Sequence, residues 1–268
     1  MATEFEPFPS PSAFRKLAAG MWRAPNDPTI YGAMDIDATA ALAHVAKVRE
    51  AGTRVTITHL VVRAVALGVA QNPDVNAKVR FWGKLERRKS VDVFVQASTD
   101  GGRDLSGARI ENADRKSLVD LAGEIAGASK AIRQGGDATY DKSRNLLRSL
   151  PWWLTRTFIK VSDVLVNELN FDLPKQGMPR DPFGSAMVTS VGMFGIDTAF
   201  APFTPIGRCP MLILIPEIRE RPWVEDGKLV VRPVLRLCAT FDHRVIDGFQ
   251  AGKLARDISA LLRDPEKL

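Results

Sequence analysis

The sequence has little cysteine. Only Cys209 and Cys238 occur among 268 residues, and both lie in apolar stretches. Two thiols so far apart in a chain of this size indicate neither a disulfide framework nor a metal-binding motif. We therefore expect two buried free thiols and no metal site.

Long apolar runs and targeting signals are also missing. No window is long enough to span a membrane without interruption. The N-terminal stretch "MATEFEPFPSPSAF" carries acidic residues and prolines where a secretory signal needs a basic segment and then an apolar one. These absences lead us to expect a cytoplasmic protein without membrane contact.

Nucleic-acid motifs are absent too, although Lys and Arg outnumber Asp and Glu by 37 to 31. The basic residues are spread along the chain apart from "LERRKS" (85–90), so we expect no nucleic-acid partner. A content of 45% hydrophobic and 25% charged residues is typical of a globular protein with a sizeable core.

Helical and strand patterns alternate along the chain, which predicts one α/β domain over residues 1–268. Helices are expected from Ser12, from Asp37 as N-cap to Gly52, and in three later segments. The helical ranges are 12–22, 37–52, 55–72, 114–136 and 248–268. The strand ranges are 29–37, 89–99, 185–196, 209–218 and a pair of strands within 228–242, with a turn at 100–105.

The stretch "TFDHRVIDGFQ" (240–250) gathers polar residues where a long strand ends at Asp242. A histidine at such a position, held by backbone, keeps one ring nitrogen free as a base, which makes His243 a candidate. Asp247 is expected to fix the loop through a charge-assisted hydrogen bond. Gly248 is expected to allow a backbone shape or a close approach that a side chain would block. The other two histidines, His44 and His59, are expected to lie on the surface or to pack.

An acyl reaction also needs a hydrogen-bond donor for the oxyanion that forms on the carbonyl. The hydroxyl groups of Thr189 and Ser190 lie in a glycine-rich segment between a strand and a turn. A purely structural role is the alternative, since hydroxyl groups commonly satisfy turns. These residues alone leave both interpretations open.

Several segments resemble one family. "DHRVIDG" is similar to the H-x-x-x-D-G active-site motif of the dihydrolipoamide acyltransferases of 2-oxo acid dehydrogenase complexes and of chloramphenicol acetyltransferase. The resemblance extends over nearly the whole chain except about 137–182. The further matching segments are "ITHLVVRAVALGVAQNPDVNA", "DRKSLVDLAGEI", "MVTSVGMFGID", "KLVVRPVLRLCATFDHRVIDG" and "LLRDPEKL".

The resemblance implies a coenzyme A-dependent acyltransferase fold, with a mixed central sheet flanked by helices, that forms homotrimers or larger cages. It implies that His243 is the general base that deprotonates the thiol of coenzyme A or of dihydrolipoamide. Thr189 would donate to the oxyanion, with Ser190 as the alternative, and Asp247 would hold the loop. Ser190, Gly192 and Gly248 are the expected substrate- and coenzyme A-binding positions. In the family, the histidine of one subunit faces the hydroxyl group of the next.

The chain departs from the family pattern in four places. No lipoyl domain and no peripheral subunit-binding domain are expected within residues 1–268, so a lipoyl group would come from a partner protein. Gly20 replaces a family arginine, and "GGRDLSG" (101–107) replaces "G-L-I-T-P". A Trp-rich insertion spans about 137–182, and we expect an extra packed helix pair there. The alternatives are a cover for the substrate entrance, a changed oligomer or a membrane-surface contact.

Two other functions stay open. The first is a small-molecule O- or N-acetyltransferase of the chloramphenicol acetyltransferase type. Enzymes of that type usually carry two adjacent histidines, whereas Asp242 precedes His243 here. The second is a non-catalytic structural subunit that assembles with an active acyltransferase, although such subunits often lose the histidine.

Overall fold

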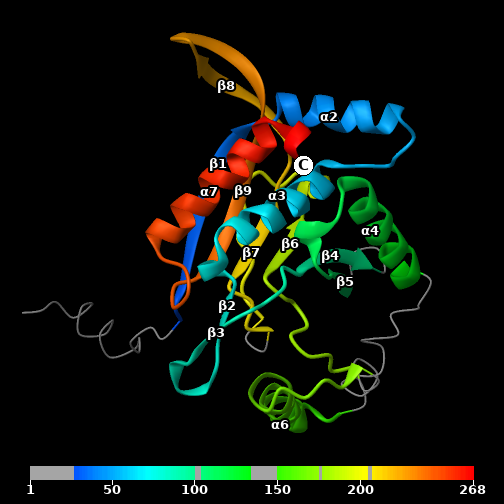
Figure 1. Cartoon of the computed structure of the whole chain (residues 1–268), viewed down its shortest axis with the longest axis vertical. Helices are drawn as coiled ribbons and strands as arrows, with labels where there is room; N and C mark the ends of the chain where they lie inside the picture. The colour runs from blue at the N-terminus through cyan, green and yellow to red at the C-terminus, as the bar shows by residue number, and fades with distance from the viewer. Residues whose placement is uncertain (1–26, 100–103, 134–149, 175–176, 205–206) are drawn as a thin grey trace, which may run out of the picture.

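The computed structural model describes residues 27–99, 104–133, 150–174, 177–204 and 207–268. A mixed sheet of seven strands forms its centre, in the order β1-β9-β7-β6-β4-β5, and β8 pairs with β9 (Figure 1). β6 is parallel to β4 and β7, whereas β9 is antiparallel to β1, β7 and β8. The strands of this sheet are β1 (Thr29–Asp37), β4 (Val93–Thr99), β5 (Asp104–Ile110), β6 (Ala186–Ser190), β7 (Met211–Ile215), β8 (Arg219–Glu225) and β9 (Lys228–Asp242).

Four helices cover one face of the sheet (Figure 1). Their apolar stripes and the inward side chains of the strands form one large core, in which Leu60, Leu121 and Leu254 are fully buried. Burial of such side chains stabilises the domain by about 1.5–3 kcal/mol each. The helices are α2 (Thr39–Glu50), α3 (Ile57–Gln71), α4 (Leu118–Arg133) and α7 (Gly248–Arg263).

The opposite face of the sheet carries a smaller apolar cluster. Met187 belongs to this cluster, whereas its neighbour Val188 points into the core under the helices. Because side chains alternate along a strand, Thr189 shares the face of Met187. The candidate hydroxyl group therefore lies on the face opposite the four helices.

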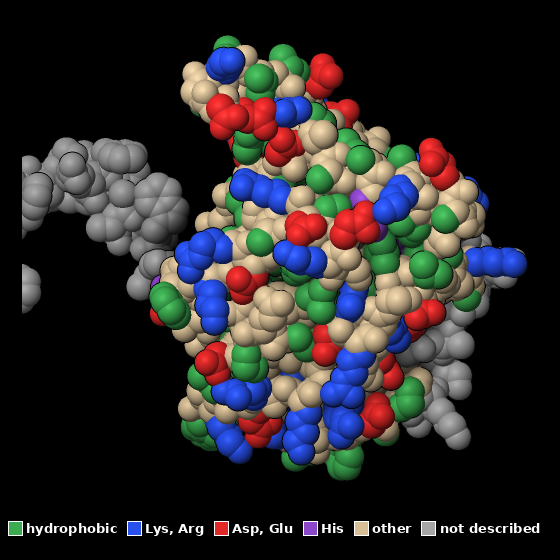
Figure 2. Space-filling model, turned by 45° about the horizontal axis from the view of Figure 1, so that its top comes forward, with side chains coloured by type: hydrophobic (Ala, Val, Ile, Leu, Met, Phe, Trp, Pro, Cys, Tyr) green, Lys and Arg blue, Asp and Glu red, His purple; other side chains and the backbone are tan. Residues whose placement is uncertain are grey.

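Two projections extend from the sheet (Figure 1). The hairpin of β8 and β9 exposes Val224, Leu229 and Val231, and the register places these three on one side of the hairpin. Figure 2 shows this projection at the top of the visible face, with hydrophobic and charged side chains mixed on it. The second projection is the two-stranded arm of β2 (Ala77–Val79) and β3 (Leu85–Arg87).

The expected α/β class and most of the expected elements are confirmed. Strand 29–37 has the predicted bounds, α3 ends before Pro73, and α7 begins at Gly248. Gly52 follows the C-cap of α2 and has a φ of 94°, which a glycine adopts without strain. Both cysteines are buried free thiols, as predicted.

Three expectations were wrong in detail. Residues 100–105 were expected to be a turn, but Asp104 and Leu105 begin β5, which is the edge strand of the sheet. The expected strand pair within 228–242 is the single strand β9, whose hairpin partner β8 was not predicted. Asp37 is not the N-cap of α2: Ala38 holds that position, and Asp37 instead accepts a hydrogen bond from the Thr39 backbone at 2.9 Å. The predicted helix at 12–22, with Gly20, lies outside the described residues.

The insertion contributes α6 (Trp152–Asp163) and a π-helical turn, η5 (Val164–Glu168), in its described part. The apolar residues of α6 with described side chains are half-buried or exposed, and Trp153 is 75% exposed. Residues 137–149 of the insertion lie outside the described residues, so the expected packed helix pair stays a prediction. No helix in the described ranges is long and apolar enough to cross a membrane.

Arg88 follows β3 and bonds the end of the insertion to the β2–β3 arm and to the segment before β7. Its guanidinium donates two hydrogen bonds to Asp181, at 2.6 and 2.7 Å, and further ones to the carbonyl oxygens of Ala77 and Arg208. Burial alone would raise the pKa of Asp181, but the hydrogen bonds and charge of Arg88 hold it below its usual value. The pair thus stays ionised and holds the segment at Arg88 against the segment at Asp181.

We expect Arg88→Lys to lower the free energy of unfolding by about 1–3 kcal/mol, because a lysine cannot reproduce the fork of hydrogen bonds in a buried site. Urea unfolding measures the change. The control is Arg87→Lys, because Arg87 makes an exposed ion pair with Asp74, and such pairs contribute about 0–1 kcal/mol. Equal losses in the two variants would contradict a structural role for the Arg88 fork.

Candidate active site

His243 lies in the loop between β9 and α7. The backbone amides of Val245 and Ile246 both donate to the carbonyl of Asp242 at 2.9 Å, which closes a tight turn. The His243 backbone amide donates to the carbonyl of Pro28 at 2.8 Å, so the loop is also attached to the segment before β1. The sequence folds this way because β9 ends at a polar residue and a capped helix follows.

The His243 ring is held by its own loop. Its Nδ1 lies 3.1 Å from the carbonyl oxygen of Ile246, and the residue is exposed. A carbonyl oxygen only accepts hydrogen bonds, so Nδ1 must carry the proton in this contact. In the neutral ring, Nε2 then has a free lone pair and is able to accept a proton.

Asp247 is the N-cap of α7. Its side chain accepts hydrogen bonds from the backbone amides of Phe249, at 2.7 Å, and Gln250, at 3.3 Å. The Gln250 side chain in turn accepts from the Asp247 amide, which completes a capping box. Asp247 thus fixes the start of the helix immediately after the His243 loop, as the sequence suggested.

No close approach is present at Gly248 within one chain, so its expected steric role toward a ligand stays a prediction. A Cβ atom built at this position meets no other atom of the described chain within 4 Å. Gly248 is the first residue of α7 and its φ lies outside the left-handed region. Nothing within one chain therefore requires a glycine here.

Thr189 and Ser190 end strand β6. Thr189 is half-buried and pairs with Leu214 of β7, whereas Ser190 is exposed. The turn that follows brings Gly192 against Pro216, whose carbonyl oxygen would lie only 2.8 Å from a Cβ atom at this position. A glycine is therefore required for the chain to leave β6 along this path.

We expect Gly192→Ala to lower the free energy of unfolding by about 1–3 kcal/mol, because backbone must move to remove the overlap. Thermal or urea unfolding provides the value. Gly123→Ala is the matched control: Gly123 is an exposed glycine within α4, and its added Cβ meets nothing within 4 Å. There the substitution should stabilise by about 0.5–1 kcal/mol, since alanine favours helix.

Within one chain the structure does not bring His243 and Thr189 together. Thr189 pairs with Leu214, and Leu214 pairs with Cys238 of the antiparallel β9, so His243 lies five residues further along. At about 3.3 Å per residue and about 4.8 Å between strands, the two residues are about 19 Å apart. They lie toward opposite ends of the strands, whereas a base and its partner must approach within about 3 Å.

A groove of about 620 Å³ opens beside the His243 loop. Asp242 and Arg244 form part of its wall and are joined to each other by two hydrogen bonds of 2.9 and 2.7 Å. Other lining side chains come from β1, from the tip of the β2–β3 arm and from the segment before β7. They include Tyr31, Phe81, Trp82, Phe203 and Arg208.

The sequence profile described as 2-oxoacid dehydrogenases acyltransferase (catalytic domain) matches residues 6–142 and 182–268. The chain belongs to this acyltransferase family. The residues between the two matched segments, 143–181, include α6 and η5.

Relatives of this acyltransferase domain are distant. The acetyltransferase component of the pyruvate dehydrogenase complex of Bacillus subtilis (strain 168) is 25% identical over 240 residues, which cover 87% of this chain and 44% of the relative. The chain thus spans about half the length of the curated relatives it matches. The Azotobacter vinelandii dihydrolipoamide acetyltransferase, in which a serine, a histidine and an asparagine were investigated for catalytic roles, has a TM-score of 0.66 at 23% identity, covering 98% of this chain and 99% of that chain.

A chloramphenicol acetyltransferase shares the fold more loosely, with a TM-score of 0.50 at 11% identity over 88% of this chain and 89% of that chain. These structural likenesses establish the expected fold: a mixed sheet with helices on its flanks. They carry no information about the acyl group or the acceptor of this family member.

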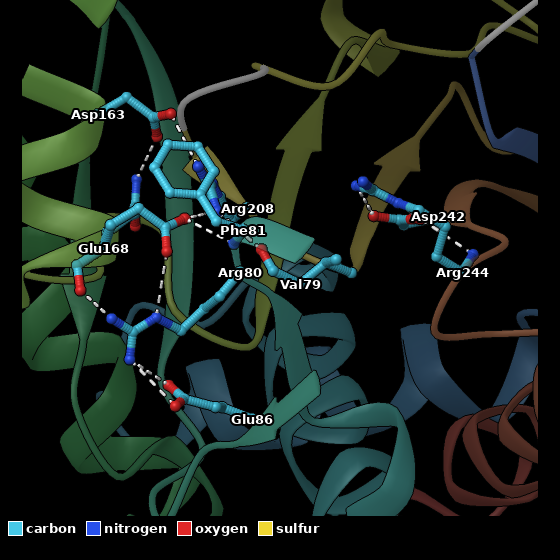
Figure 3. A network of polar contacts seen from close by, with 10 residues as sticks. Val79, Arg80, Phe81, Glu86, Asp163, Glu168, Arg208, Asp242 and Arg244 are labelled. Carbon is cyan, nitrogen blue, oxygen red and sulfur yellow. Dashed lines mark hydrogen bonds and ion pairs between the residues drawn. The ribbon is translucent and has the colours of Figure 1, made fainter. Parts of the chain in front are cut away.

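The insertion contacts residues that line the groove of this acyltransferase domain (Figure 3). Glu168 of η5 contacts Arg80 and Phe81 of the β2–β3 arm and also pairs with Arg208. Arg208 additionally pairs with Asp163 of α6 at 2.8 Å. The network thus joins the insertion, the arm and the segment before β7 into one unit.

Sequence reasoning missed several of these residues. The capping partner Gln250 was readable from the D-x-x-Q spacing, which is a recognised helix-start pattern. The Arg80–Glu168–Arg208 network was not readable, because its members are far apart in the sequence. His59 packs as predicted: it is buried, and its Nδ1 accepts from the Thr56 amide at 2.9 Å.

Cys209 lines the groove but does not supply a reactive thiolate. Burial is the main factor that raises the pKa of the Cys209 thiol, to about 12, so this group stays protonated at neutral pH. Because the thiolate is the nucleophilic form, Cys209 is inert. Within the described ranges, no three His, Cys, Asp or Glu side chains are grouped closely enough to hold a metal ion.

Proposed function

We propose that this domain transfers an acyl group between coenzyme A and a dihydrolipoamide-type thiol, with His243 as the general base and Thr189 as the oxyanion donor. The observation that carries the proposal is the Nδ1 contact of His243 with the Ile246 carbonyl, which leaves Nε2 free as a base. Nε2 takes the proton of the acceptor thiol, and the thiolate attacks the thioester carbonyl. The tetrahedral oxyanion accepts a hydrogen bond from Thr189, and the leaving thiolate then takes the proton back from the imidazolium.

The separation of His243 and Thr189 supports an active site shared between copies of the chain. At about 19 Å, one chain does not complete the site. We propose a homotrimer in which His243 of one subunit meets Thr189 of the next. The exposed apolar side of the β8–β9 hairpin supports self-association, because such surfaces on projections commonly form interfaces.

Asp247 takes part as a positioning residue. In the Azotobacter vinelandii protein, the investigated histidine and asparagine are four residues apart, as are His243 and Asp247 here. An aspartate at this place still caps α7 and so sets the position of the His243 loop. Ser190, Gly192 and Gly248 are the further substrate- and coenzyme A-binding positions that we propose.

The groove beside His243 is the proposed route of the acceptor thiol. Its aromatic side chains offer an apolar surface of the kind that a lipoyl chain would contact, and Arg244 lies in the same wall. We propose that a partner protein supplies the lipoyl group in trans. We propose that this partner belongs to a 2-oxo acid dehydrogenase complex. Larger cages of such trimers would need a second interface between trimers.

The proposal is tested by acetyl transfer from acetyl-CoA to free dihydrolipoamide. Transfer that saturates in both substrates supports the assignment. A domain that is inactive with dihydrolipoamide but acetylates a hydroxyl or amine compound in a panel would be of the chloramphenicol acetyltransferase type. Inactivity with the whole panel, together with co-purification with another acyltransferase chain, would identify a structural subunit.

A further inference from the structure

A second hollow, of about 670 Å³, lies on the other side of the β2–β3 arm from the groove. Its walls come from β2 and β3, the loop that leads into β4 and the end of β5. The insertion contributes Asn170, Asp172, Arg180 and Asp181. Val79 of β2 lines the groove near His243, whereas its neighbour Lys78 lines this second hollow. The two spaces are therefore separate, with β2 between them.

Lys78 is a buried cation without a partner. The residue is only 8% exposed, and no acceptor of the described chain lies within hydrogen-bond or ion-pair distance of its ammonium group. Its cross-strand neighbour Glu86 is bound instead by Arg80, at 2.9 and 3.0 Å, and by Lys84, at 3.0 Å. Burial lowers the pKa of Lys78, and the charge of Asp181 acts in the opposite direction.

Five carboxylates line the hollow, and that of Asp172 accepts a hydrogen bond from the Arg180 backbone amide at 2.8 Å. Asp181 is bound by Arg88 through two hydrogen bonds, and Glu111 pairs with Arg109 at 2.7 Å. Asp92 accepts a hydrogen bond from a backbone amide at 3.0 Å. Each of these carboxylates thus holds a donor other than Lys78, and Asp181 acts on the lysine only through its charge. A lysine with so little exposure is rare in proteins.

Two further cations face the same hollow. The side chains of Lys89 and Arg180 line it, and neither has an acidic partner within the part of the chain that the structure describes. Three unpaired cations around one space fit a compact dianion with several oxygens, since lysine binds phosphate as a point charge and arginine binds it through its fork. We propose that this hollow binds a phosphate group, either free or carried by a small molecule, with Lys78 as its central ligand.

Thermal unfolding in the presence of inorganic phosphate tests this binding, and it does not depend on acyl transfer. At constant ionic strength, phosphate at about a hundredfold its Kd should raise the Tm of the wild type by about 5–10 °C. Lys78→Met should remove this rise. Without phosphate the variant should be as stable as the wild type or more stable, because it removes a buried unpaired charge.

Lys160→Met is the matched control, since Lys160 is an exposed lysine of α6 outside the hollow. It should keep the full rise. A rise of equal size in Lys78→Met, or no rise in the wild type, would overturn the proposal. Competition separates the two sources of the phosphate. Displacement of inorganic phosphate by coenzyme A but not by dephospho-coenzyme A identifies the 3′-phosphate of coenzyme A as the ligand. Displacement by neither identifies a free phosphate or another small ester.

Discussion

The His243→Ala variant should lose acetyl transfer from acetyl-CoA to dihydrolipoamide by a factor of about 10²–10⁴. The reason is that a free thiol is mostly protonated at neutral pH, so without Nε2 of His243 no group of the loop removes the proton. The contact between Nδ1 and Ile246 fixes the ring without any other side chain. Loss of the His243 side chain should therefore lower kcat strongly. It should leave the fold intact, because His243 is exposed.

His44→Ala is the control for the loss of a histidine elsewhere. His44 is half-buried on α2 and far along the chain from the loop. Its substitution should change the rate by less than about threefold. Equal activity of His243→Ala and the wild type would exclude His243 as the base and would require another group to deprotonate the thiol.

Local residue patterns predicted the helices and strands whose periodicity and end signals lie within one short stretch of sequence. The alternation of "TIYGAMDID" gave β1, and the period of "ITHLVVRAVALGVAQ" with the following proline gave α3. The polar end of β9 and the cap at Asp247 gave the His243 loop. In each case a short stretch contains both the periodicity and the residue that ends it.

The missed features depend on contacts between distant segments. β5 was missed because its glycine, Gly107, weakens the strand pattern, yet a Cβ there would meet the Phe94 ring at 2.5 Å. This close packing against β4 requires a glycine. Local strand propensity does not reveal such a contact. β8 was missed because it pairs only with the projecting half of β9 and has few buried residues.

The candidate site was predictable as residues but not as an arrangement. The loop pattern and the family resemblance named His243 and Thr189, whereas the strand register shows that they lie toward opposite ends of the strands within one chain. The insertion illustrates the same limit: its amphipathic pattern suggested a buried stripe, whereas its attachment runs through the ion pairs of Arg208. Charged pairs between distant segments leave no periodic signal.

A mixture of two inactive variants should recover activity. Thr189→Val removes the proposed oxyanion donor while keeping the shape of the side chain, and it should lower kcat by about 10²–10³. If His243 of one subunit meets Thr189 of the next, each variant still supplies the half that the other lacks. After unfolding and joint refolding of equal amounts of Thr189→Val and His243→Ala, about a quarter of the sites in random mixed trimers should be intact.

The measurement is acetyl transfer by the mixture, compared with each variant refolded alone. Recovery to about a quarter of the wild-type rate supports a site shared between subunits, since no rearrangement within one chain spans about 19 Å. Ser190→Ala, refolded with His243→Ala in the same way, distinguishes the two neighbouring hydroxyl groups. A mixture no more active than its components, in trimers shown by mass measurement to be mixed, would place the complete site within one chain and would require a different donor near the His243 loop.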